Sequence, residues 1–138
     1  MKVQLKPSDV IKDRGNWTKG ALAKTNRGHT CGVRSREAEK FCLLGAIKKA
    51  NNSHLSGLAK IMSDLILKKK PDLGRWNHIP KDIIIGFNDD CGTKHSEVLS
   101  VLTEAENICL TPLRRKQAAE RARPSRKRVK NVSTLQLN

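Results

Sequence analysis

The chain has 138 residues, of which 28 are Lys or Arg and 13 are acidic, a formal net charge of +15; a positive field of this size attracts polyanions. The longest apolar run, FCLLGAI at 41–47, is far shorter than the roughly 20 residues that span a bilayer, and charges interrupt the N-terminus before a signal-peptide core can form. We therefore expect a cytoplasmic protein with no membrane partner, long enough to bury one core and with its four cysteines as free thiols.

The N-terminal part predicts a short helix and a small hairpin. Ser8 would cap a helix that stops at Gly15. The turn TNRG at 25–28 could then close a β-hairpin over residues 17–33. Trp17 is the expected anchor of this hairpin on the helices.

Residues 37–50 (EAEKFCLLGAIKKA) predict the central helix. Its middle is apolar on all sides, so the helix must be surrounded by other elements. Acidic residues (Glu37, Glu39) would lie in its first turn and basic residues (Lys48, Lys49) in its last, the placement that the helix dipole favours.

Three small residues belong to this central segment. Ser35 is the expected cap of the helix. Cys42 lies among apolar residues, and burial there would disfavour the reactive thiolate. Gly45 costs about 1 kcal/mol in mid-helix, which indicates the close approach of another element, either the hairpin around Trp17 or the helix after Thr93.

Further helices follow. Leu58, Ile61, Met62 and Leu65 fall at helical spacing, and this helix should stop before Pro71. Residues 71–80 are loop-like, and the run III at 83–85 could be a strand or a buried helix.

The most regular helical pattern begins after a turn at residues 88–92. Thr93 would cap this helix, which would end by Pro112. Its apolar face would contain five residues: Val98, Val101, Leu102, Ala105 and Ile108.

These patterns predict a mainly α fold, a compact bundle of about four helices around the buried central helix 37–50, with a small β-hairpin at 17–33 and a basic C-terminal tail. We expect a helical domain at 1–110 and the tail at 111–138. Residues 113–123 could extend as a polar helix, whereas 124–138 have too little to bury and should be disordered unless bound.

The tail has nine basic residues and one acidic residue, a net charge of +8. Dense cations on a flexible backbone without aromatic residues suit sequence-independent phosphate contacts. The basic residues are Arg114, Arg115, Lys116, Arg121, Arg123, Arg126, Lys127, Arg128 and Lys130.

Three sequence blocks carry a family resemblance. They are WTKGALA at 17–23, FCLLGAI at 41–47, and FND at 87–89 followed by Thr93 and EVL at 97–99. In this order they resemble a family of small bacterial and bacteriophage domains of unknown function, whose members read roughly W-x-x-G-A-L-A, then (W/F)-C-L-L-G-A, then W-N-D with T-x-x-E-V-L. The resemblance covers roughly residues 10–109 and excludes the basic tail, and Phe87 stands where Trp is usual. It implies a compact, mainly helical domain of phage or bacterial origin, and it transfers no catalytic residues.

Other sites are disfavoured by spacing. His29, Cys31, Cys91 and His95 could supply two Cys and two His to zinc, but H-x-C and C-x3-H are not the usual zinc-binding pairs. The acidic residues at 88–92 lack the twelve-residue calcium loop, so a turn is the better reading. With no recognisable Cys-His signature or phosphate loop, we expect no enzyme activity and no cofactor.

The helices at 37–50 and 55–67 could also form a helix-turn-helix. The outward positions of the second helix are poor material for reading bases, so a structural helical hairpin is favoured. These positions are Ser56, Lys60, Ser63 and Asp64.

The sequence thus predicts a non-catalytic accessory protein that binds DNA or RNA through its basic tail and the Lys/Arg-rich body. The alternative is a protein-interaction module that docks on an acidic surface of a host enzyme or an assembly component, because electrostatic steering serves that role equally well. A purely solubilising tail would account for the same run of charge.

Overall fold

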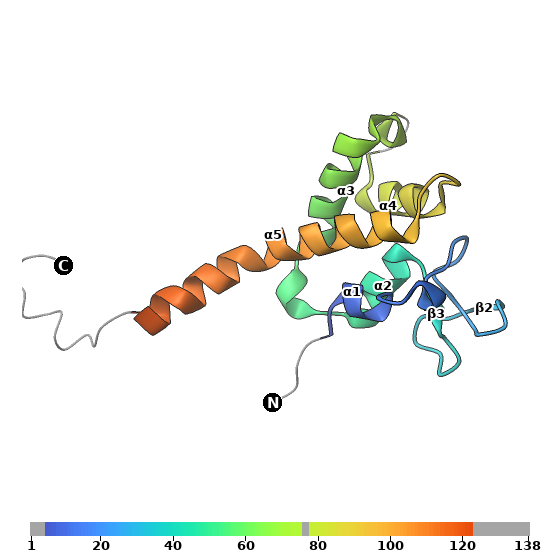
Figure 1. The fold of residues 1–138 in the computed structure, drawn as a ribbon, viewed down its shortest axis with the longest axis horizontal. Coiled ribbons are helices and arrows are strands. Elements are labelled where there is room, and N and C mark those ends of the chain that lie inside the picture. Colours follow the sequence, from blue (N-terminus) through green and yellow to red (C-terminus); the bar gives the residue numbers. More distant parts are fainter. Residues whose placement is uncertain (1–4, 76–77, 123–138) are drawn as a thin grey trace, which may run out of the picture.

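The structure is a computed structural model that describes residues 5–75 and 78–122, with residues 112–122 as backbone only. It is mainly helical, as predicted, with one small sheet (Figure 1). The α-helices are α1 (Pro7–Val10), α2 (Leu43–Ala50), α3 (Leu58–Lys69), α4 (Pro80–Asp89) and α5 (His95–Ala122). Short 3-10 helices are η1 (Arg14–Asn16), η2 (Ser53–Leu55) and η3 (Pro71–Gly74), and the strands are β1 (Ala23–Lys24), β2 (Thr30–Cys31) and β3 (Lys40–Phe41).

The sheet contains the predicted hairpin and a third strand that was not predicted. β1 pairs antiparallel with both β2 and β3, so Ala23 lies opposite Cys31 on one side and Phe41 on the other. Gly28 has φ +89°, a conformation that glycine adopts without strain and that the predicted turn requires. The hairpin prediction is therefore confirmed.

The central helix is shorter than predicted. It begins at Leu43, because the backbone of β3 is already paired with β1 and Cys42 takes the N-cap position. The prediction that Glu37 and Glu39 form its first turn, with Ser35 as cap, is therefore wrong. Its burial was predicted correctly, since the first four residues of α2 are all buried.

Gly45 is the place where the sheet region meets α2. A Cβ atom at this position would overlap the carbonyl oxygen of Leu22. The same oxygen accepts a hydrogen bond from the Cys42 amide at 3.2 Å, so the close approach is fixed by backbone pairing. The element that approaches Gly45 is thus the segment after Trp17, one of the two that were expected.

α3 ends before Pro71 as predicted, and residues 83–85 form part of helix α4, which begins with Pro80 at its first turn. α3 packs chiefly against α4 and α5, whereas α2 packs against α1 and α4. Consequently α2 and α3 do not form the expected helical hairpin. Tertiary packing overrides the β-preference of the isoleucines, because the helix buries Ile83, Ile84 and Phe87.

α5 differs from its prediction at both ends. It begins at His95 rather than after a Thr93 cap, because the Glu97 carboxylate accepts from the Lys94 amide at 3.0 Å. At its other end the helical backbone continues through Pro112 to Ala122, so the predicted stop at Pro112 is wrong and the predicted polar extension is confirmed to that residue. Figure 1 shows the orange-to-red half of α5 projecting away from the other elements.

The buried face of α5 also departs from the pattern near its middle. Val98, Val101, Leu102 and Ala105 are fully buried, as predicted, but Ile108 is 44% exposed. Glu106 is buried instead, and its carboxylate accepts from the Ser8 amide (2.8 Å) and hydroxyl (2.6 Å). Ser8 therefore lies inside α1 as a partner of α5 and is not the cap of that helix.

Candidate functional site: a buried asparagine beside a basic pocket

Asn88, at the end of α4, joins the sequence blocks that carry the family resemblance. Its side chain is fully buried, and its Oδ1 atom accepts from Trp17 Nε1 at 2.6 Å and from the Leu43 amide at 3.0 Å. Its Nδ2 group donates to the carbonyl oxygen of Thr18 and to Asp89 Oδ1, both at 3.0 Å. The first two blocks are thus tied to the third by one amide side chain whose donors and acceptor are all used.

The two residues after Asn88 extend this connection. Asp89 Oδ1 accepts from the Gly20 amide at 3.0 Å, and the Asp90 carbonyl accepts from Lys19 Nζ at 2.6 Å. Residues 88–90 therefore hold the chain from Trp17 to Gly20 with side-chain and backbone contacts. We predicted only a local turn here, whereas Asn88 and Asp89 are still in α4 and the turn begins at Asp90.

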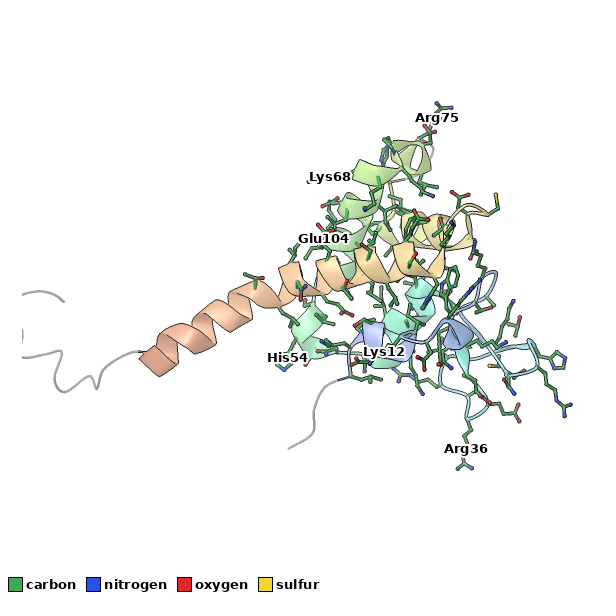
Figure 2. The ribbon with its side chains drawn as sticks, viewed as in Figure 1. Lys12, Arg36, His54, Lys68, Arg75 and Glu104 are labelled. Carbon is green, nitrogen blue, oxygen red and sulfur yellow. The ribbon has the colours of Figure 1, made fainter. Side chains whose placement is uncertain are left out.

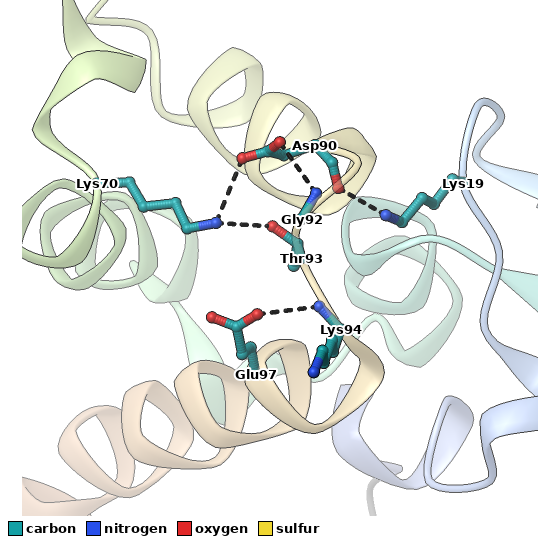
Figure 3. A network of polar contacts seen from close by, with 7 residues as sticks. All are labelled: Lys19, Lys70, Asp90, Gly92, Thr93, Lys94 and Glu97. Atoms are coloured by element: carbon teal, nitrogen blue, oxygen red, sulfur yellow. Dashed lines mark hydrogen bonds and ion pairs between the residues drawn. The ribbon is translucent and has the colours of Figure 1, made fainter.

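Asp90 is the centre of a network of charged and polar groups (Figure 3). Its carboxylate accepts from the Gly92 amide at 3.3 Å and from Lys70 Nζ at 3.3 Å, and Lys70 also donates to Thr93 Oγ1 at 3.2 Å. The Gly92 hydrogen bond, followed by Lys70, holds the pKa of Asp90 below its ordinary value. Thr93 and Glu97 belong to the third sequence block of the family resemblance. Three residues separate them here, one more than in the T-x-x-E pattern of that family.

A hollow of about 610 Å³ opens beside this network. We call it the basic pocket. Its lining consists of three cations, two rings and two hydroxyl groups, from Arg14, Lys19, Lys94, Trp17, His95, Thr93 and Ser96. The pocket therefore draws on η1, the following loop and the start of α5, which are far apart in the sequence.

The Trp17 and His95 rings that line the pocket are held in place by contacts with each other and with neighbouring residues. Trp17 lies 5.6 Å from the His95 ring between centroids, and Lys19 Nζ lies 5.4 Å from the Trp17 centroid, within cation–π range. His95 Nε2 is 2.7 Å from the carbonyl oxygen of Ile11. The indole is also anchored by its hydrogen bond to Asn88, so the wall of the pocket is preorganised.

The cations at its rim are exposed. Neither the Arg14 guanidinium nor the Lys94 ammonium has a hydrogen-bond or ion-pair partner among the residues whose side chains the structure describes. Two carboxylates lie close by in the sequence: Asp90 pairs with Lys70, and Glu97 accepts from the backbone amide of Lys94. The pocket thus presents positive charge without a carboxylate in its lining.

The predicted nucleic-acid-binding residues fall in two groups. Arg114, Arg115, Lys116 and Arg121 occupy positions in the helical backbone of α5, in its projecting half (Figure 1). Arg123, Arg126, Lys127, Arg128 and Lys130 lie outside the described residues. The body's own cations are spread over different sides, as Lys12, Arg36, Lys68 and Arg75 show in Figure 2.

The four residues weighed as zinc ligands have separate surroundings. His29 and Cys91 are exposed on different turns, Cys31 is half-buried in β2, and His95 lies against Trp17. Among residues 5–75 and 78–111, no group of three or more His, Cys, Asp or Glu side chains is placed to hold a metal ion.

Two of the thiols differ in burial, since Cys42 is buried and Cys109 is half-buried. Cys42 is buried at the N-cap of α2, where its Sγ atom accepts from the Gly45 amide at 3.3 Å. Burial raises the pKa of Cys42 despite this hydrogen bond, and burial likewise raises the pKa of Cys109, which donates to the Ser56 carbonyl at 3.1 Å. Burial therefore disfavours the thiolate of both residues, as expected for Cys42.

α3 is poorly suited to act as a recognition helix. Lys60, one of its outward cations, donates to Asp64 at 2.9 Å, so its charge is already paired. Ser63 was expected to face outward but is buried, with its hydroxyl bonded to the Lys60 carbonyl. Of the four positions considered for base reading, the one cation is therefore paired and one serine is buried.

Sequence reasoning missed the basic pocket and the role of Asn88. Trp17 and Lys19 were noted as part of a sequence block, but nothing local to residues 14–19 points to residues 93–96. The only available signal was the presence of Trp17 and the FND triplet in separate blocks of one resemblance.

No helix in the described part of the chain has the length and apolar character needed to cross a membrane.

Comparison with known proteins identifies the family of this chain. No curated protein and no solved structure matches the chain significantly. A family profile covers residues 6–108, a span that includes Asn88, the basic pocket and the three sequence blocks but not the tail. The chain therefore belongs to DUF6197, a family of unknown function.

Proposed function

We propose that this protein is a non-catalytic accessory protein, of phage or bacterial origin and acting in the cytoplasm, that binds nucleic acid through phosphate contacts of its basic tail and body. The observation that carries the proposal is the path of α5. One continuous helix joins the packed body to the region where the positive charge is densest. A basic helix that projects from a folded body is accessible to a polyanion along its length (Figure 1).

The charge distribution favours phosphate contacts over reading of bases. The tail contains no aromatic residue on which a base could stack, and Lys60, the cation considered for base reading on α3, is paired with Asp64. Contacts of this kind release counterions, so the affinity should fall steeply as salt rises.

The test compares the full-length chain with two variants that each lose four positive charges. The first replaces Arg114, Arg115, Lys116 and Arg121 by Gln, which keeps a comparable helix propensity. The matched control replaces Arg36, Lys68, Lys69 and Arg75, all exposed on the body, by Gln. Removal of residues 113–138 serves as the extreme case and should abolish most of the binding while leaving the fold intact.

Affinity for duplex DNA and for single-stranded RNA is measured over a range of salt concentrations. Each lost phosphate contact should flatten the slope of log K against log salt by roughly 0.9 on duplex DNA, so the tail variant should lose much more of the slope than the control. Absent binding, or binding insensitive to salt, refutes the proposal and leaves an acidic protein surface as the partner to test.

A further inference from the structure

The basic pocket is a concentration of charge on the body that is separate from the tail. Its three cations come from positions 14, 19 and 94, and its lining contains no carboxylate. Two lysines elsewhere in the body are paired with carboxylates, Lys60 with Asp64 and Lys70 with Asp90. The pocket instead gathers three cations from separate segments around one hollow that no carboxylate lines.

Its geometry keeps these cations near one another. Lys19 is fixed by the Asp90 carbonyl and by the face of Trp17, so it cannot move far from the wall. Arg14 and Lys94 border the same hollow from η1 and from the residue before α5. Like charges held together repel each other, and an anion in the hollow would remove that repulsion.

The remaining groups suit a phosphate. An arginine, two lysines and hydroxyl groups supply donors for several oxygens of one anion. Ser96 and His95 also begin α5, where backbone amides favour negative charge, as a secondary contribution. The volume of about 610 Å³ exceeds that of a phosphate alone and falls within the range of small-molecule sites.

We propose that the basic pocket binds the phosphomonoester group of a nucleotide, either free or at the end of a nucleic-acid strand. A monoester carries up to two negative charges near neutral pH, against one for a phosphodiester, and three cations without a carboxylate match the larger charge. In its strand-bound form this inference rests on the proposed function, since the tail would hold the strand whose end enters the pocket.

The experiment uses the full-length chain and four probes: inorganic phosphate, adenosine 5′-monophosphate, and one short single-stranded oligonucleotide carrying either a 5′-phosphate or a 5′-hydroxyl. The pocket variants are Arg14→Gln and Lys94→Gln. The matched controls are Arg36→Gln and Lys68→Gln, which remove the same charges at exposed positions outside the pocket.

The wild-type chain should prefer the phosphorylated oligonucleotide roughly tenfold, the effect of charge-assisted hydrogen bonds to one added phosphate. Each pocket variant should lose most of that preference, whereas the controls keep it. Loss of the tail charges should lower the affinity for both oligonucleotides and keep their ratio. Equal binding of both oligonucleotides by the wild type, together with no measurable affinity for the monophosphate, would overturn the inference.

The two proposals fail in different ways. If the oligonucleotides bind through the tail but Arg14→Gln and Lys94→Gln behave like their controls, the pocket inference is wrong and the proposed function stands. If adenosine 5′-monophosphate or inorganic phosphate binds with dependence on Arg14 and no nucleic acid binds, the pocket is supported as a site for a free phosphate compound and the proposed function is wrong.

Discussion

Replacement of Asn88 by Ala should destabilise the protein severely. The side chain is fully buried, and its removal leaves two donors, Trp17 Nε1 and the Leu43 amide, without their acceptor. Each buried group left unsatisfied costs about 1–3 kcal/mol, so the expected loss is roughly 2–6 kcal/mol. This is a large fraction of the roughly 5–15 kcal/mol that stabilises a typical domain.

The measurement is urea unfolding followed by circular dichroism, with Asn107→Ala as the matched control. Asn107 is exposed on α5, and its replacement should change the free energy of unfolding by no more than about 0.5 kcal/mol. If Asn88→Ala unfolds with the same free energy as the control, the reasoning that one amide ties the sequence blocks together is refuted.

Gly45→Ala should lower the free energy of unfolding by several kcal/mol, because the added Cβ overlaps the backbone carbonyl of Leu22. The control is Gly32→Ala, where the added atom meets nothing within 4 Å. Equal thermal unfolding of the two variants would contradict the close approach of Leu22 to Gly45. Asp90→Asn should reduce the loss of stability that the protein shows as the pH falls. The pKa of Asp90 is lowered in the fold, so its contribution to the free energy of unfolding is present above the unfolded pKa near 4 and is lost as the pH falls through the folded pKa. An unchanged dependence of the unfolding free energy on pH would contradict this prediction. A thiol reagent should modify exposed Cys91 quickly and buried Cys42 only as fast as the fold opens. Peptide mass mapping over time measures both rates. Comparable rates would show that Cys42 is accessible in the folded protein.

Local patterns were sufficient for some elements and not for others. The periodic apolar residues of α3 and of the first half of α5 predicted both helices, because each pattern lies within one element. The TNRG turn predicted the hairpin for the same reason. Gly45 also carried information about a distant neighbour, since a glycine inside an apolar helix is costly unless something must approach it.

The failures share a physical cause, which is long-range contact. Residues 37–41 have helical composition, but Lys40 and Phe41 pair with a strand 16 or more positions earlier in the chain. Asn88 has turn chemistry, yet its acceptor atom serves donors 71 and 45 residues away. The basic pocket exists only because those contacts bring the segment around Trp17 to the start of α5. Of the candidate site, the sequence therefore predicted the tail's charge and could not predict the pocket on the body.

Because α5 is one continuous helix, it fixes the distance between the basic pocket and the basic positions of the tail. At about 1.5 Å per residue, the helix places the position of Arg114 roughly 28 Å along its axis from His95 at the pocket. Base pairs in a duplex repeat every 3.4 Å, so a strand must reach across about eight of them to touch both places at once. If the tail and the basic pocket bind one strand as proposed, the length of that strand, rather than its sequence, decides whether the pocket and the position of Arg114 are both engaged.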